Sequence, residues 1–263
     1  MTSVRDLYAV HVHGDGPTTL LLAHGLASDQ SIWGPLAARL SDLRLVTFDY
    51  PGAGAAAPAA YDPVRHASLD GYAQDLLAIV DAFGGPAPVV VGHSMSAAIA
   101  LLAARQAPGR IARLIALAPS PRYLDDPPDY RGGFSEHDID ELLELMESNF
   151  LGWATTFAQA AAPQPDLAVQ MSQTFARASA SSVRTLAAIV LRSDLRDLLP
   201  AIDMPTLVVQ CAHDAIVPVH VGEHMARALP RGAYRLIDVA GHFPHLSAPD
   251  LVASVIRDAL GGA

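Results

Sequence analysis

The segment from Pro88 to Ala98 constrains the fold more than any other part of the chain. A run of apolar, β-prone residues leads through a tight turn at Ser94 into an apolar, helix-forming stretch. Two positions before and after Ser94 stand Gly92 and Ser96, both small, as a strand and a helix require if they are to approach each other across so sharp a turn. The segment therefore predicts a nucleophile elbow, which presents a reactive serine at the end of a buried strand. The alternative is an ordinary strand-to-helix turn that happens to contain serine.

This elbow lies within a long alternation of strand and helix patterns. Apolar runs recur between helix-like stretches, which is typical of a mainly parallel sheet covered on both faces. These runs are Leu43–Phe48, Pro88–Val91, Ile111–Leu117, Thr206–Gln210 and Tyr234–Val239. Two earlier runs, Tyr8–His13 and Thr19–Ala23, are joined by a turn rich in glycine and proline and predict an opening hairpin. We therefore expect a doubly wound α/β fold.

The strand pattern is interrupted between Pro121 and Asp194. A turn-rich entry is followed by four helix-like stretches at Glu136–Glu147, Phe150–Ala161, Asp166–Ala178 and Ser181–Leu191. Ser135 can cap the first of them, with Asp138 in its first turn. Because ligands bind at the carboxyl ends of strands in open α/β sheets, the insertion should cover that edge as a lid. The expected organisation is a core over residues 1–121, a helical lid over residues 122–195 and the rest of the core over residues 196–263.

A nucleophilic serine needs a base, because its hydroxyl is a poor nucleophile at neutral pH. In chains with this kind of elbow, the acid and then the histidine follow the serine along the sequence. Asp214 and His242 each follow a strand run, so we expect both at the same sheet edge as Ser94. The sequence predicts Ser94 as nucleophile, His242 as base and Asp214 as the residue that orients the base. The rival acids are Asp203, which precedes a strand, and Asp238, which lies within one.

Acyl transfer at a serine also requires two backbone N–H groups that bind the developing oxyanion. One belongs to the residue after the nucleophile, which is Met95, and the other to a loop after an early strand. We assign the second to Leu26, because the preceding Gly25 permits the backbone to turn its amide inward.

Two other motifs suggest cofactors but fit them poorly. The His-x-x-Glu-His run at 220–224 matches a zinc pattern, yet Gly222 weakens the helix that would carry it and no third ligand is evident. Residues 52–57 follow a strand like a dinucleotide fingerprint, but Pro58 cuts off the helix that would bind the pyrophosphate. A solvated helix face and a plain loop are the preferred interpretations. We expect neither a metal nor another cofactor.

The charge of the chain argues against polyanionic partners. The formal net charge is −10 and the sequence pI is near 5.4, so the surface should repel phosphate backbones and anionic lipid. We expect neither a nucleic-acid partner nor a membrane partner. The first eight residues lack the apolar region of a secretory signal, which predicts a cytoplasmic protein. Cys211 is the only cysteine, so an intrachain disulfide is excluded and a small buried hydrophobe is expected.

Motifs spread along the chain resemble those of the RsbQ-like α/β hydrolases, the family of a bacterial energy-stress regulator and of the plant strigolactone and karrikin receptors. They comprise His24–Gly25, residues 30–33, 92–97, 119–124, 130–134 and 149–153, Gln210–Cys211 and residues 241–249. Ser96, two positions after the nucleophile, matches this family's own pattern. The family often has Phe-Gly where this chain has Leu26 and Ala27.

The resemblance implies an α/β-hydrolase fold with a cap of four helices over a deep apolar pocket. It also implies a small hydrophobic ester or lactone as substrate and a signalling role with a sensor phosphatase as protein partner. The family's pocket lining carries over by motif to Phe134, Trp153 and Phe157, with Leu26, His93 and Met95 near the reacting centre. Ordinary core packing is the alternative for these aromatic residues. The alternative functions are a metabolic carboxylesterase or lactonase without a partner, and a ligand-binding receptor with very slow turnover.

Overall fold

The computed structural model describes residues 2–261, so the end residues of the predicted core segments 1–121 and 196–263 lie outside the described part. A seven-stranded sheet has the strand order β1-β3-β2-β4-β5-β6-β7. β1 is antiparallel to β3, and all other neighbours are parallel. The strands are β1 (His11–His13), β2 (Thr19–Ala23), β3 (Arg44–Thr47), β4 (Val89–His93), β5 (Arg113–Leu117), β6 (Thr206–His213) and β7 (Gly232–Ala240). The predicted mainly parallel sheet is confirmed.

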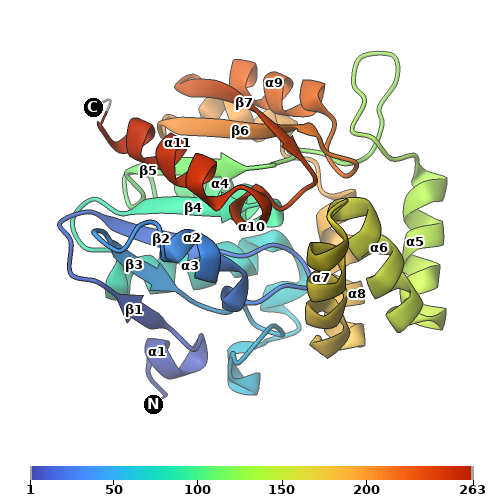
Figure 1. Cartoon of the computed structure of the whole chain (residues 1–263), viewed down its shortest axis with the longest axis horizontal. Helices are drawn as coiled ribbons and strands as arrows, with labels where there is room; N and C mark the ends of the chain where they lie inside the picture. The colour runs from blue at the N-terminus through green and yellow to red at the C-terminus, as the bar shows by residue number, and fades with distance from the viewer. Residues whose placement is uncertain (1, 262–263) are drawn as a thin grey trace.

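Helices cover both faces of this sheet. On one face α11 packs against α2 and α10, which lie in front of the strands in Figure 1, and elsewhere α3 packs against α4 and α9 against β6 and β7. The helices outside the insertion are α1 (Val4–Leu7), α2 (Gly34–Ala37), α3 (Leu69–Phe83), α4 (Met95–Gln106), α9 (Val219–Ala228), α10 (Pro244–Ser247) and α11 (Pro249–Gly261). Short 3-10 helices are η1 (Gln30–Trp33), η2 (Pro58–Ala60), η3 (Arg65–Ala67) and η4 (Arg196–Ala201). Within residues 2–261, no helix combines the length and the apolar character that crossing a membrane requires.

The predicted opening hairpin is wrong. β3 lies between β1 and β2, and it pairs antiparallel with β1 and parallel with β2. β2 is buried at every position and therefore suits the interior of the sheet, whereas the exposed His11 and His13 make β1 an edge strand. The linking turn instead crosses the turn before β3, since a Cβ atom on Gly16 would lie 2.2 Å from the carbonyl oxygen of Asp42. The turn was correctly located, but the pairing partner of β1 comes from farther along the chain.

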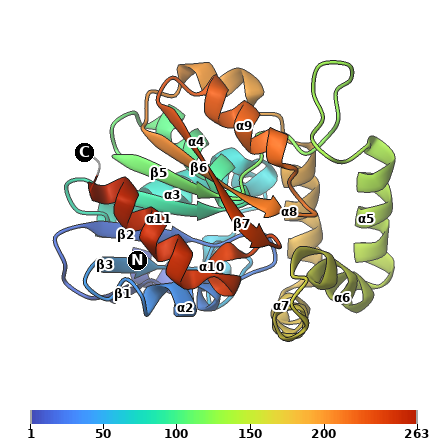
Figure 2. The same ribbon diagram turned by 45° about the horizontal axis from the view of Figure 1, so that its top comes forward.

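The insertion between β5 and β6 forms four helices that stand together beside one end of the sheet (Figures 1 and 2). They are α5 (Glu136–Ser148), α6 (Phe150–Ala161), α7 (Pro165–Arg177) and α8 (Ala180–Arg192). All four helices were predicted, and each end falls within one residue of its expected position. Ser135 and Asp138 form a reciprocal capping box at the start of α5, as the sequence predicts. In the group, α6 packs against α7, and α5 packs against α8.

Candidate active site

Ser94 occupies a strained turn between β4 and α4. Its backbone dihedral angles are φ 53° and ψ −117°, a conformation that residues with a side chain rarely adopt. A Cβ atom on Gly92 would lie 2.9 Å from the carbonyl carbon of Ser96, so a larger residue would push strand and helix apart. The Ser96 hydroxyl donates a hydrogen bond to the carbonyl oxygen of His24, which links the elbow to the loop after β2. This turn therefore holds the Ser94 hydroxyl at the carboxyl end of a central, fully buried strand.

The structure brings Ser94, His242 and Asp214 into a continuous hydrogen-bonded chain. His242 Nε2 lies 2.9 Å from Ser94 Oγ, and His242 Nδ1 lies 2.8 Å from Asp214 Oδ2. Asp214 follows β6 and His242 follows β7, so parallel strands deliver all three residues to one sheet edge. An ionised carboxylate only accepts hydrogen bonds, and therefore the imidazole proton sits on Nδ1 and leaves Nε2 as an acceptor for the serine proton.

The loop after β6 fixes the orientation of Asp214. Asp214 Oδ1 accepts hydrogen bonds from the N–H groups of Ile216 at 2.8 Å and Val217 at 3.1 Å, while Oδ2 faces His242. The side chain of Asp214 is fully buried. Of the rival acids, Asp238 is 97% exposed and faces His213, and Asp203 is exposed at the chain's entry to β6. Asp214 is thus the carboxylate in contact with His242.

His93 ties the serine turn to the histidine loop. Its Nε2–H donates to the carbonyl oxygen of His242 at 2.8 Å, and its ring packs 4.9 Å from the His242 ring. Burial, together with the charges of His245 and His242, lowers the pKa of His93 well below its usual value. His93 therefore remains neutral at neutral pH and serves as a fixed hydrogen-bond donor.

The loop after β2 carries Leu26, whose amide was assigned to the oxyanion. The prediction that Gly25 is needed for backbone freedom in this loop is wrong, because Gly25 does not adopt the left-handed backbone conformation. A Cβ atom at Gly25 would instead lie 2.6 Å from His93 Nδ1, so the close approach of the two segments requires glycine. The left-handed residue in this loop is Ala27, with φ 57°. On the other side, Met95 begins α4, and the first N–H of a helix has no acceptor within that helix.

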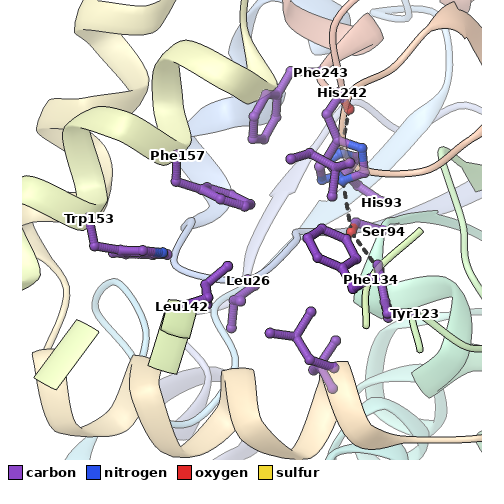
Figure 3. Close-up of a pocket in the computed structure, with 13 residues that line it drawn as sticks. Leu26, His93, Ser94, Tyr123, Phe134, Leu142, Trp153, Phe157, His242 and Phe243 are labelled. Carbon is purple, nitrogen blue, oxygen red and sulfur yellow. Dashed lines mark hydrogen bonds between the residues drawn. The ribbon is translucent and has the colours of Figure 1, made fainter. Parts of the chain in front are cut away.

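A largely apolar cavity opens beside Ser94 (Figure 3). The sequence-predicted residues in its wall are Leu26, His93, Ser94, Phe134, Trp153, Phe157 and His242. In the inserted helix α6, the Trp153 ring stacks between those of Phe150 and Phe157, with centroids 5.2 and 5.4 Å away. The Met95 side chain lies elsewhere, in the wall of a smaller pocket beside His24.

Six further residues line the cavity without having been assigned to it from the sequence. They are Tyr123, Leu142, Val190, Leu191, Ile216 and Phe243. Tyr123 is distinctive, because its hydroxyl lies 3.2 Å from Ser94 Oγ. Both Tyr123 and Phe243 belong to the family motifs at residues 119–124 and 241–249, so the sequence could have identified them as cavity residues. Leu142 and Val190 belong to helices with ordinary amphipathic patterns, and nothing in such a pattern separates a cavity wall from a core.

The two motifs that suggested cofactors have protein partners of their own. His220 Nε2–H donates to the carbonyl oxygen of Arg131 at 2.8 Å, and the His224 ring packs against Tyr130. In the loop 52–57, the Asp49 carboxylate accepts the N–H of Ala55 at 2.8 Å. A carboxylate in that position would repel a pyrophosphate. Cys211 is buried, as expected, and burial raises the pKa of its thiol.

The chain is similar to known hydrolases over almost its whole length. A family model described as alpha/beta hydrolase fold matches residues 18–249. The karrikin insensitive 2 receptor CA of Petunia hybrida is 36% identical, over 97% of this chain and 96% of the receptor. A strigolactone esterase of Pisum sativum is 33% identical, over 98% of both chains. The structure of a hydrolase from Oleispira antarctica has a TM-score of 0.95 and 32% identity, over 99% of this chain and 97% of the other. These similarities confirm the resemblance predicted from the motifs.

Proposed function

The chain belongs to the α/β-hydrolase family, and we propose that it hydrolyses a small hydrophobic ester or lactone through Ser94, His242 and Asp214. Its similarity to a strigolactone esterase and to a hydrolase from Oleispira antarctica makes it a carboxylic ester hydrolase. The observation that carries the assignment of residues is the contact chain from Asp214 through His242 to Ser94, which ends in the cavity wall.

The proposed reaction begins when His242 Nε2 takes the proton of Ser94 Oγ as the oxygen attacks the substrate carbonyl carbon. Asp214 keeps the imidazole in the required tautomer through the bond at Nδ1. The amides of Leu26 and Met95 bind the oxyanion of the tetrahedral intermediate. His242 then gives its proton to the leaving-group oxygen, and an acyl-enzyme remains on Ser94. Water, activated by the same histidine, releases the acid and restores the serine.

The substrate class follows from the composition of the cavity wall. Aromatic and aliphatic side chains dominate it, as in sites that bind small apolar ligands. The wall contains no Asp, Glu, Lys or Arg among the described residues, so a charged substrate would lose hydration without gaining a partner. A compact, uncharged ester or lactone suits these surroundings. We further propose that α5–α8 act as a lid over this cavity.

Labelling with a fluorophosphonate probe tests the assignment, because the probe reacts with activated serine hydroxyls. We expect modification of Ser94 in the native protein and none in Ser94→Ala, with peptide mass spectrometry locating the adduct. Ser120→Ala is a suitable control, since Ser120 is also buried after a strand but bonds the carbonyl oxygen of Arg122. Labelling of another serine in place of Ser94, or no labelling, would refute the proposal.

A signalling role is the second candidate, supported by the similarity to a karrikin receptor. In this version the protein turns its ligand over slowly and acts through a protein partner such as a sensor phosphatase. Pre-steady-state kinetics separates the two versions: one fast acylation followed by very slow release indicates a receptor, and sustained turnover indicates a metabolic esterase or lactonase. A stable complex of the purified protein with a sensor phosphatase, formed only with ligand, would establish the signalling version.

A further inference from the structure

Tyr123 places a hydroxyl group directly beside the proposed nucleophile. Its side chain is 3% exposed, and its oxygen lies 3.2 Å from Ser94 Oγ (Figure 3). Tyr123 comes from the segment after β5, whereas Leu26 comes from the loop after β2. Since β4 lies between these two strands in the sheet, Tyr123 approaches Ser94 from the side opposite to Leu26.

The direction of this hydrogen bond follows from the other bonds at the site. Ser94 has one hydroxyl proton, and His242 Nε2 needs it because His242 Nδ1–H already donates to Asp214. Ser94 Oγ therefore has only lone pairs to offer to Tyr123. The Tyr123 hydroxyl must therefore donate this hydrogen bond, and Ser94 Oγ accepts it.

Little else in the cavity wall can donate a hydrogen bond to a ligand. The other side chains in the wall that carry a polar atom are His93, Ser94, Trp153 and His242. The ring N–H of His93 already donates to the carbonyl oxygen of His242, and His242 Nε2 is hydrogen-bonded to Ser94 Oγ. Burial raises the pKa of Tyr123 to about 12, so its hydroxyl keeps its proton at neutral pH. The indole N–H of Trp153 also has no partner among the described residues, but Trp153 lies on the far side of the cavity from Ser94 (Figure 3). The Tyr123 O–H is therefore the side-chain donor beside Ser94 that can turn to the substrate.

We propose that Tyr123 passes its hydrogen bond from Ser94 Oγ to the leaving-group oxygen of the ester or lactone during acylation of Ser94. This inference rests on the function proposed above. As the bond from Oγ to the carbonyl carbon forms, Oγ becomes an ester oxygen and a weaker acceptor. When the bond from that carbon to the leaving oxygen breaks, its electron pair goes to the leaving oxygen, which takes the proton from His242 Nε2. Tyr123 keeps its own proton and stabilises the charge that develops on the leaving oxygen.

The geometry favours the leaving oxygen over the oxyanion as the second acceptor. Ser94 Oγ and the leaving oxygen are bonded to the same carbon in the tetrahedral intermediate, so a donor within reach of one needs only a small rotation to reach the other. The oxyanion points toward the amides of Leu26 and Met95, away from the side on which Tyr123 stands. An alcohol that leaves reluctantly should therefore depend on Tyr123 more than one that leaves readily.

The test compares native protein and Tyr123→Phe on esters of one acid whose alcohols range from nitrophenol to simple alkanols. We expect kcat/KM to fall about tenfold to a hundredfold for alkyl esters, and less than about threefold for the nitrophenyl ester, because a donor matters most where most charge develops. Fluorophosphonate labelling of Ser94 should persist, since fluoride leaves without help. Tyr130→Phe is the matched control: Tyr130 lies in the same segment, but its hydroxyl donates to the carbonyl oxygen of Arg122 and lies outside the cavity wall.

The dependence on the leaving group distinguishes this role from a structural one. An equal loss across the whole ester series, or no loss at all, would overturn the inference, because a side chain that only shapes the site affects every ester alike. Thermal melting of Tyr123→Phe verifies that the fold is retained. Suppose that the native protein is labelled at Ser94 and hydrolyses the esters, but the loss in kcat/KM for Tyr123→Phe does not vary with the leaving group. That result would refute the role of Tyr123 alone. A native protein that neither labels nor hydrolyses sinks the proposed function as well.

Discussion

The loops at the sheet edge and the helices α5–α8 contribute different things to the same cavity. The loops supply directional polar contacts, from Asp214 to His242 at 2.8 Å and from His242 to Ser94 at 2.9 Å. The helices supply apolar surface, as with Trp153 and Val190. Bond-making needs fixed distances and angles, whereas recognition of an apolar ligand needs shape. The two requirements are met by separate segments of the chain, so they can be perturbed separately.

Hydrogen bonds join the two regions beside the proposed base. The N–H of His242 donates to the carbonyl oxygen of Ala161, at the end of α6, at 2.7 Å. Gln164, just before α7, donates from Nε2 to the carbonyl oxygen of Ala240. The α6–α7 connection therefore supports the loop that carries His242, whereas the cavity residues of α6, Trp153 and Phe157, lie earlier in that helix.

The largest effect should come from the loops. We expect Ser94→Ala and His242→Ala each to reduce ester turnover by about 10⁴-fold to 10⁶-fold, because the members of such a triad act as a unit. Steady-state kinetics with a chromogenic ester measures the loss, and Ser193→Ala, at the end of the inserted helix α8, is the control with unchanged turnover. A loss below about tenfold for either variant would remove that residue from the mechanism.

The next effect concerns the helices. For Trp153→Ala we expect the affinity for a bulky apolar ester to fall about a hundredfold, because truncating a packed ring costs a few kcal/mol. Labelling of Ser94 by a small probe should persist. Trp153→Phe keeps an aromatic ring and should weaken binding much less, and it remains informative if the alanine variant unfolds. Should the alanine variant fold and bind bulky esters as before, shape recognition does not reside in α6.

The sequence predicts the two regions unequally well. Periodicity located the four inserted helices and most strands, because each pattern is local. The pairing of β1 with β3 was not predicted, because the partner of this edge strand lies some thirty residues farther along the chain. The spacing of Ser94, Asp214 and His242 was readable because fold geometry brings strand ends together. The sequence does not identify Leu142 and Leu191 as cavity residues, because the apolar face of a helix has the same pattern whether it packs against a core or lines a cavity.

The stability of the protein in acid should depend on the buried histidines of the core and not on the exposed histidine of the inserted helices. His245 is fully buried, and burial, with the charge of His242 adding to it, lowers the pKa of His245 to about 3. In the unfolded chain a histidine titrates near ~6.5. Below that pH the unfolded state binds a proton that the folded state does not, so stability is present above about pH 6.5 and is lost as the pH falls.

Denaturant titrations at pH 7, 6 and 5 measure this effect. We expect His245 to contribute a loss of about 2 kcal/mol in the free energy of unfolding between pH 6.5 and 5. In His245→Leu the fall should be shallower by that amount, whatever the absolute stability of the variant. His137→Gln changes the histidine of α5, which is 78% exposed, and should leave the slope unaltered. Parallel curves for native protein and His245→Leu would show that His245 does not titrate as described.

The smallest expected effect is on stability, and it compares the same alanine-to-glycine substitution in a strained loop and in an unstrained helix. Ala27 has φ 57°, where a Cβ atom costs about 1–2 kcal/mol, and glycine in its place relieves that cost while adding freedom to the unfolded chain. The net expectation for Ala27→Gly is a stabilisation on the order of 0.5 kcal/mol. Ala188→Gly, in the middle of α8, should instead destabilise by about 1 kcal/mol, because the helix gains nothing from glycine. Melting curves of the two variants give the signs directly. If both destabilise equally, the loop that carries Leu26 holds Ala27 without strain, and the backbone strain at this edge of the sheet then lies at Ser94 and at Ala118, which also have positive φ.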